Sequence, residues 1–130
     1  MTDRKRKLAE LAANFVGAFN RHDIDAAMAF VCETAIFEDA RGGRFVGKQA
    51  IRDAFMPLFN GTLGSPIFHD DDLFVDVEQG KVAVSWELQI TVAGVDKRLR
   101  GVDMLHFDGD KLARKLTYAK AETPPYLSKT

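Results

Sequence analysis

The sequence predicts an α+β fold in which three N-terminal helices pack against a strongly curved sheet that is mixed but mainly antiparallel. Apolar residues recur at helical spacing from residue 8 to residue 19, whereas from residue 73 onward they alternate with polar ones. The predicted strands are long and the turns between them are short, as is typical of an antiparallel meander. Helices packed on one face of such a sheet can enclose a cone.

The three helices are indicated by periodicity and by their end signals. The first carries a stripe of apolar residues on one face, formed by Leu8, Leu11, Ala12, Phe15, Val16 and Phe19. Asp23 stands where an N-cap acceptor is needed and precedes a short second helix. Gly47 opens a third helix, and Pro57 must end or kink it because proline lacks an N–H donor and clashes with the preceding turn.

The strands follow in order. Residues 34–39 alternate in side-chain character and form one strand before the turn at 41–44. Turn residues at 79–80, 94 and 108–110 then divide the rest of the chain into a meander. Its last strand runs from Leu112 to Tyr118.

Length and charge exclude several classes of protein. The 130 residues predict one domain over 1–130, with a core at about 8–120 and a C-terminal tail at 121–130. A formal charge of -1 provides no global field for nucleic acid or an anionic membrane. The single cysteine, Cys32, excludes an intramolecular disulfide framework. No apolar run approaches the length of a membrane span, so we expect a cytoplasmic protein.

Two aspartates share strand faces with apolar residues and are the candidate catalytic groups. Asp103 shares a face with Leu99, Leu105 and Phe107, so burial would favour its neutral acid, which can donate a hydrogen bond to an enolate oxygen. Alternatively, Asp103 binds the backbone at a bulge near Gly101 or faces water. Asp39 ends an apolar strand face, where an ionised carboxylate could act as a general base, or it caps the adjacent turn.

The arrangement resembles ketosteroid isomerase and, more broadly, the SnoaL-like polyketide cyclases of the nuclear transport factor 2-like superfamily. The resemblance covers residues 8–120 and rests on segments 20–25, 35–39, 47–52, 101–103 and 108–109. It implies the cone-shaped, cystatin-like fold of that superfamily. It also implies that Asp39 shuttles a proton between two carbons and that Asp103 is a protonated acid in an oxyanion hole.

The chain departs from the isomerase at two positions. Phe15 matches the tyrosine that is the main oxyanion donor, and Phe55 matches a second, supporting tyrosine. Phenylalanine cannot donate to an enolate, and the loss of one oxyanion donor typically costs about two to three orders of magnitude in rate. Tyr118 and Trp86 are candidate substitute donors.

The leading hypothesis is a cofactor-free isomerase or cyclase that binds a small, largely apolar ligand bearing a carbonyl. Asp39 would be the base and Asp103 the oxyanion acid, with neither a metal nor an organic cofactor required. The predicted ligand-binding residues line the cone: Phe15, Phe19, Phe37, Phe55, Phe59, Trp86, Leu105, Phe107 and Tyr118.

Two other functions stay open. A non-catalytic ligand-binding or dimerisation module would use the same pocket only as a hydrophobic cavity. Water addition, as in the epoxide hydrolases of this fold, would need Arg100 beside Asp103, which requires a bulge at Gly101.

The resemblance also implies a homodimer that forms through the outer sheet face. That face mixes polar and apolar residues in the manner of a subunit interface. It carries Ser85, Glu87, Gln89, Arg98, Arg100, Val102, Met104 and His106.

Overall fold

Helix α1 (Asp3–Asn20) lies across one face of the sheet and buries the predicted apolar stripe. A computed structural model describes residues 3–120, so the predicted tail at 121–130 lies outside the described residues. The last residue of α1, Asn20, fastens this helix to the sheet. Its side-chain amide donates to the carbonyl of Phe68 at 2.9 Å and accepts from the Phe68 N–H at 2.7 Å.

The two shorter helices begin and end as their sequence signals predict. Asp23 caps helix α2 (Ile24–Ala29), because its side chain accepts from the Ala26 N–H at 3.0 Å. Helix α3 (Lys48–Phe55) follows Gly47, whose φ of 94° lies in the region that favours glycine. The helix ends before Pro57, which lies instead in the short 3₁₀ helix η1 (Met56–Leu58).

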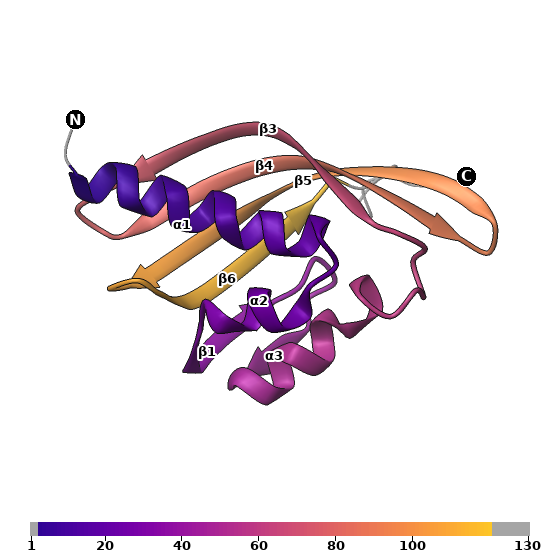
Figure 1. The fold of residues 1–130 in the computed structure, drawn as a ribbon, viewed down its shortest axis with the longest axis horizontal. Helices are drawn as coiled ribbons and strands as arrows, with labels where there is room; N and C mark the ends of the chain where they lie inside the picture. Colours follow the sequence, from indigo (N-terminus) through magenta and orange to yellow (C-terminus); the bar gives the residue numbers. More distant parts are fainter. Residues whose placement is uncertain (1–2, 121–130) are drawn as a thin grey trace, which may run out of the picture.

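Six strands form one mixed sheet in the order β2-β1-β6-β5-β4-β3. The strands are β1 (Val31–Glu38), β2 (Arg44–Val46), β3 (Ile67–Asp76), β4 (Lys81–Val92), β5 (Val95–Asp108) and β6 (Lys111–Ala119). Strands β3 to β6 make the predicted antiparallel meander, and β1 pairs with β6 in parallel. The helices cover one face of this twisted sheet, and the β4–β5 hairpin extends past them (Figure 1). The predicted α+β class is therefore confirmed.

A one-residue bulge changes which side chains β6 turns toward the helices. The Gly109-Asp110 turn pairs Asp108 with Lys111 and Phe107 with Leu112, but the next pair is His106 with Arg114. Ala113 is therefore the extra residue. Beyond it, Lys115 pairs with Leu105 and Thr117 pairs with Asp103, on the face toward the helices.

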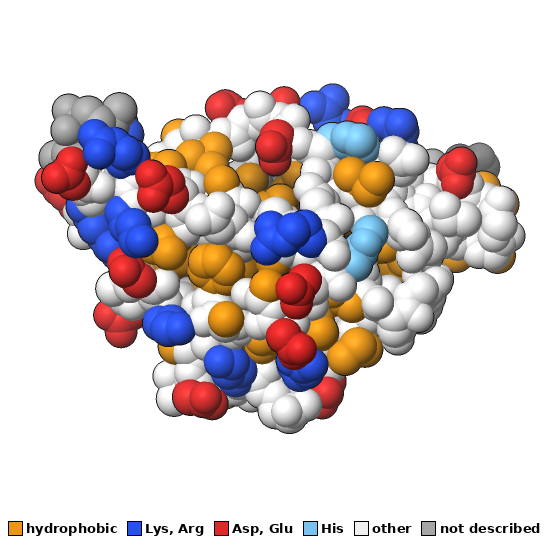
Figure 2. All heavy atoms as spheres, viewed as in Figure 1, with side chains coloured by type: hydrophobic (Ala, Val, Ile, Leu, Met, Phe, Trp, Pro, Cys, Tyr) orange, Lys and Arg blue, Asp and Glu red, His pale blue; other side chains and the backbone are white. Residues whose placement is uncertain are grey.

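The core lies between the helices and the concave face of the sheet, and its largest fully buried side chains include Phe15, Phe55, Leu8 and Leu105. On the face shown in Figure 2, basic and acidic side chains are interspersed with hydrophobic ones. Within residues 3–120, no helix is long and apolar enough to cross a membrane.

Candidate ligand-binding cavity

An aromatic cavity of about 270 Å³ lies between α1, α3 and the strands β1, β5 and β6. Four of the predicted ligand-binding residues line it, namely Phe15, Phe19, Phe37 and Phe55, and both candidate catalytic aspartates do so as well. Its other lining residues are Val16, Ala40, Arg41, Ala54, Pro57, Leu58, Leu63, Phe68 and Lys115. The cavity is therefore mostly apolar, with charged groups from three segments of the chain.

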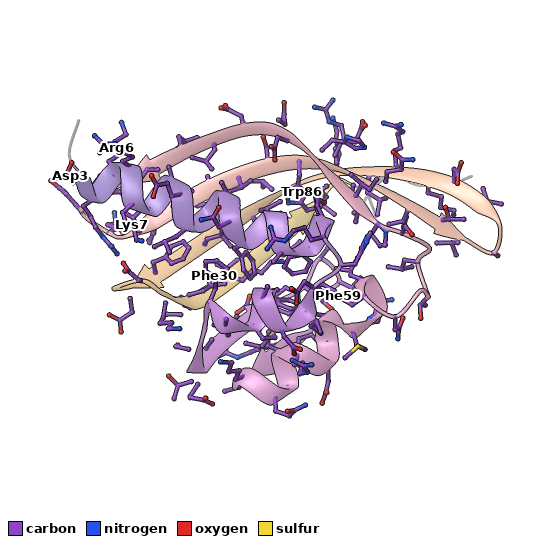
Figure 3. The ribbon with its side chains drawn as sticks, viewed as in Figure 1. Asp3, Arg6, Lys7, Phe30, Phe59 and Trp86 are labelled. Atoms are coloured by element: carbon purple, nitrogen blue, oxygen red, sulfur yellow. The ribbon has the colours of Figure 1, made fainter. Side chains whose placement is uncertain are left out.

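Edge-to-face and tilted ring contacts build its aromatic wall. The Phe19 and Phe55 rings have centroids 5.1 Å apart, and those of Phe37 and Phe55 are 5.0 Å apart. Such ring contacts stabilise the wall by more than the burial of apolar surface alone would. Phe30 and Phe59 lie on the helix side of this cluster, whereas Trp86 lies on β4 (Figure 3).

Asp103 and Lys115 form a buried ion pair at the cavity wall. Nζ of Lys115 lies 3.3 Å from Oδ1 of Asp103, and the side chains are 11% and 7% exposed. The Thr117 hydroxyl donates to the same Oδ1 at 2.7 Å and accepts from Lys115 Nζ at 2.7 Å. Strand parity thus predicts the burial of Asp103 correctly, whereas its two partners, Lys115 and Thr117, were not expected.

Asp39 follows β1 and reaches the cavity from a tight turn. Its Oδ1 accepts from the backbone N–H groups of Arg41, at 3.0 Å, and Gly43, at 2.7 Å. A Cβ at position 43 would lie 2.8 Å from Oδ2, so glycine is what allows the carboxylate to lie so close. The turn-capping role and a place at the cavity therefore coexist in one side chain.

The hydrogen-bond donors around the cavity are few. Among the described residues that line it, only Arg41 and Lys115 carry side-chain N–H groups, and none carries a hydroxyl. Phe15 and Phe55, which the sequence resemblance matches to tyrosines, are 1% and 2% exposed. The Asp103 carboxylate accepts hydrogen bonds from Lys115 and Thr117.

Four other predicted ligand-binding residues lie elsewhere on the interior side. Leu105 and Phe107 belong to the buried core, because they lie progressively nearer to the β5–β6 turn than Asp103 does. Trp86 is also core, its ring in edge contact with Phe68 at 5.4 Å. Phe59 packs behind Phe19, with ring centroids 5.0 Å apart.

Tyr118 is turned away from the aromatic cavity. The Ala113 bulge reverses the parity of β6, so Tyr118 pairs with Val102 on the outer face and is 57% exposed. It lines a separate pocket together with Glu38, Asp39 and Thr117. Neither Tyr118 nor Trp86 is therefore placed in the aromatic cavity as the substitute donor that we considered.

Arg100 lies on the opposite face of β5 from Asp103. The pairing of β4 with β5 runs without a break through Trp86 and Gly101, so no bulge brings the two side chains together. The Arg100 guanidinium lies instead 3.6 Å from a carboxylate oxygen of Asp71 on the outer side. The arginine–acid arrangement required for epoxide-hydrolase-like water addition is absent at this position.

Lys115 is the site residue that the sequence analysis missed. A regular hairpin register from the Gly109-Asp110 turn would place Leu116 opposite Asp103, with Lys115 facing outward. β6 also contains Lys111 and Arg114, so Lys115 is one of three basic residues in the strand, and only its inward direction distinguishes it. Its direction depended on a bulge that the local sequence does not announce.

Comparisons with solved structures show the same fold over most of the chain. A protein from Xanthomonas campestris pv. campestris, provisionally named as a polyketide cyclase, is 20% identical with a TM-score of 0.81, covering 89% of this chain and 92% of its own. An NTF2-like protein of unknown function from Mesorhizobium loti is 21% identical with a TM-score of 0.78, covering 93% and 97%.

A further similar structure is TerC co-crystallised with polyporic acid, which is 15% identical with a TM-score of 0.74 and covers 88% of this chain and 92% of its own. No curated protein matches the sequence. A family model for the SnoaL-like domain matches residues 12–115. The chain is therefore a member of the SnoaL-like domain family, with the NTF2-like fold of its structural neighbours.

Proposed function

We propose that the aromatic cavity binds a small, largely apolar molecule bearing a carbonyl and catalyses proton transfer next to that carbonyl without a cofactor. Asp39 is the general base. It takes a proton from the carbon beside the carbonyl, and the C–H electron pair passes into the enolate, whose charge lies mainly on oxygen. Where a C=C bond is conjugated with the enolate, return of the proton to its far carbon gives isomerisation. Attack of the enolate carbon on a second carbonyl of the same ligand gives cyclisation, and the proton on Asp39 then passes to the new alkoxide oxygen.

One observation carries this proposal. Asp39 and the Asp103–Lys115 pair face the same cavity, whose remaining wall consists mainly of phenylalanine rings and aliphatic side chains. An acceptor able to take a proton and a charged polar cluster therefore meet in one apolar space. Oδ2 of Asp39 is the oxygen suited to the base role, because Oδ1 is held by two backbone N–H groups.

The comparisons agree with this choice of ligand class without deciding it. One similar structure is provisionally named as a polyketide cyclase, and another was crystallised with polyporic acid. The cavity of about 270 Å³ suits a molecule of two or three fused rings at most.

Deuterium exchange tests the proton transfer directly. Wild-type protein is incubated in heavy water with 2-indanone and 2-tetralone, and loss of the proton signals beside the carbonyl is followed by NMR. We expect exchange above the buffer rate and a decrease of about 10²–10⁴-fold in Asp39→Asn. Equal exchange rates in the two proteins would show that Asp39 is not the base.

A non-catalytic binding module is the second candidate, and a specific observation favours it. Asp39 already serves the turn through Oδ1, and phenylalanine stands at both tyrosine positions. In that case the two ketones would bind with saturation while their exchange rates stay at the buffer value.

A further inference from the structure

We propose that Lys115 is the group that receives the ligand's oxygen, so that the cavity selects ligands whose buried oxygen is, or becomes, negatively charged. Enols, phenols and enolisable carbonyl compounds are the ligand class that this donor would recognise. The inference rests on the proposed function, because it takes the aromatic cavity as the ligand site.

Counting the hydrogen bonds of Lys115 leaves one donor for a ligand. An ammonium has three N–H groups, and two of them go to Asp103 Oδ1 and Thr117 Oγ1. Within residues 3–120 no third acceptor is assigned to Nζ. Instead, Nζ lies 4.5 Å from the ring centroid of Phe37 and 5.6 Å from that of Phe55.

These two rings place the remaining N–H beside the ligand space. Phe37 and Phe55 both line the aromatic cavity, as Lys115 itself does. An ammonium N–H that faces only aromatic rings retains much of its capacity to bind an oxygen anion, because a charge-assisted hydrogen bond is stronger than a neutral one. The ammonium is therefore placed to bind an oxygen that enters between the rings.

Asp103 and Thr117 hold Lys115 in position rather than compete for the ligand. The three side chains form a closed triangle in which Lys115 donates twice and the Thr117 hydroxyl donates to Asp103. This fixes the end of a long, flexible side chain that would otherwise lose rotamer entropy on binding. Asp103 is thus a positioning residue in this arrangement.

Lys115 is one of two side-chain hydrogen-bond donors at a cavity whose described lining residues carry no hydroxyl. Phe15 and Phe55 provide no O–H group, and Arg41, the other lining residue with a side-chain N–H, is exposed. A buried ammonium stabilises a negative oxygen more strongly than an exposed guanidinium does, because solvent screens the exposed charge. Lys115 is therefore the stronger of the two candidate donors.

The test uses 4-nitrophenol, whose phenolate form absorbs visible light and whose neutral form does not. The pH at which the bound phenol ionises is measured by absorbance in wild type, Lys115→Met and the control Lys97→Met, which changes an exposed lysine on β5. We expect ionisation in wild type and Lys97→Met about 1–3 pH units below that in Lys115→Met.

Each other outcome has a definite meaning. An equal midpoint in wild type and Lys115→Met overturns the inference and leaves the proposed function standing. A midpoint that rises in Arg41→Met but stays at the wild-type value in Lys115→Met also overturns it, in favour of the guanidinium. No saturable binding to wild type removes the cavity as a ligand site and overturns both.

A second variant covers the case in which Lys115→Met does not fold. Lys115→Met combined with Asp103→Asn removes both charges, so no buried charge is left alone. In this double variant, bound 4-nitrophenol is expected to ionise about 1–3 pH units above its midpoint in wild type. A midpoint in the double variant equal to that of wild type would overturn the inference.

Discussion

The ammonium of Lys115 lies 3.3 Å from Oδ1 of Asp103, and both side chains are almost fully buried. Asp103 on β5 pairs with Thr117 on β6, and Lys115 precedes Thr117 by two residues on the same face. The Thr117 hydroxyl donates a hydrogen bond to the Asp103 carboxylate. An ion pair in such a place costs much of its Coulomb energy in desolvation. The pair is therefore expected to contribute little net stability compared with apolar side chains of similar size.

The first prediction concerns the contribution of this pair to the unfolding free energy of the protein. Lys115→Met and Asp103→Asn should each lower the unfolding free energy by about 3–5 kcal/mol, because each leaves a buried polar or charged group without its partner. The double variant should lose less than the sum of the two single changes. Urea denaturation of the four proteins measures the coupling, and simple additivity would contradict a direct interaction.

The second prediction separates the two roles of Asp39. Asp39→Asn keeps an Oδ1 acceptor for the N–H groups of Arg41 and Gly43, so the turn and the thermal midpoint should be preserved. Asp39→Ala removes that acceptor and should cost about 1 kcal/mol of stability. Thermal unfolding compares the two variants. A large loss of stability in Asp39→Asn would mean that its amide cannot replace the carboxylate in the turn.

The third prediction concerns Gly101, which lies opposite Trp86 across β4 and β5. A Cβ at position 101 would overlap the indole ring at Cη2 and lie 2.5 Å from the Tyr118 carbonyl oxygen. Gly101→Ala should therefore displace the indole and lower stability by about 1–3 kcal/mol. Tryptophan fluorescence and urea denaturation report both effects, since Trp86 is the single tryptophan. An unchanged spectrum would show that the sheet yields instead.

The fourth prediction is a pH dependence that arises at His106. Burial, and then the charges of Lys81 and Arg114, lower the pKa of His106 from its ordinary value of 6.5. The folded state therefore binds a proton less readily than the unfolded state does. The unfolding free energy should fall as the pH drops below about 6.5, where the unfolded chain becomes protonated first.

Comparison with His106→Gln isolates this contribution. The difference between the unfolding free energies of wild type and His106→Gln should change between pH 8 and pH 5.5, with wild type losing more. A difference that stays constant over that range would contradict the lowered pKa.

The fifth prediction concerns assembly, because we propose that the outer face of β4, β5 and β6 joins two copies of this chain. Val102, Met104, Leu116 and Tyr118 are all at least partly exposed on this face. Met104→Glu should convert a dimer into a monomer in sedimentation velocity experiments. Asn14→Glu, which introduces the same charge at an exposed position of α1 away from this face, is the control. A wild-type monomer at all concentrations would contradict the proposal.

The helices and their ends could be predicted from the sequence because they depend on residues close together in the chain. The α1 stripe, the Asp23 cap and the break before Pro57 each depend on contacts within a few residues. The inward direction of Asp103 was also predictable, since β5 pairs with β4 without interruption along its length. Strict alternation then carries the face assignment from one end of the strand to the other.

The site was less predictable where the direction of a side chain depended on how two strands pair. Lys115 and Thr117 face Asp103, and Tyr118 faces outward, because of one bulge in β6. No turn residue or proline marks that position in the sequence. The shape of the cavity also depends on how deep each residue lies along its strand, which is why Leu105 and Phe107 share a face with Asp103 but lie in the core.

The bulge at Ala113 has a consequence for how this cavity could diverge during evolution. Lys115 and Thr117 face inward because of the number of residues between them and the β5–β6 turn, not because of their own side chains. If β6 kept its length but paired with β5 without the bulge, Leu116 would lie opposite Asp103 and Lys115 would face outward. A register shift of one residue in β6 could therefore exchange a charged wall for an aliphatic one, while a substitution would alter a single group.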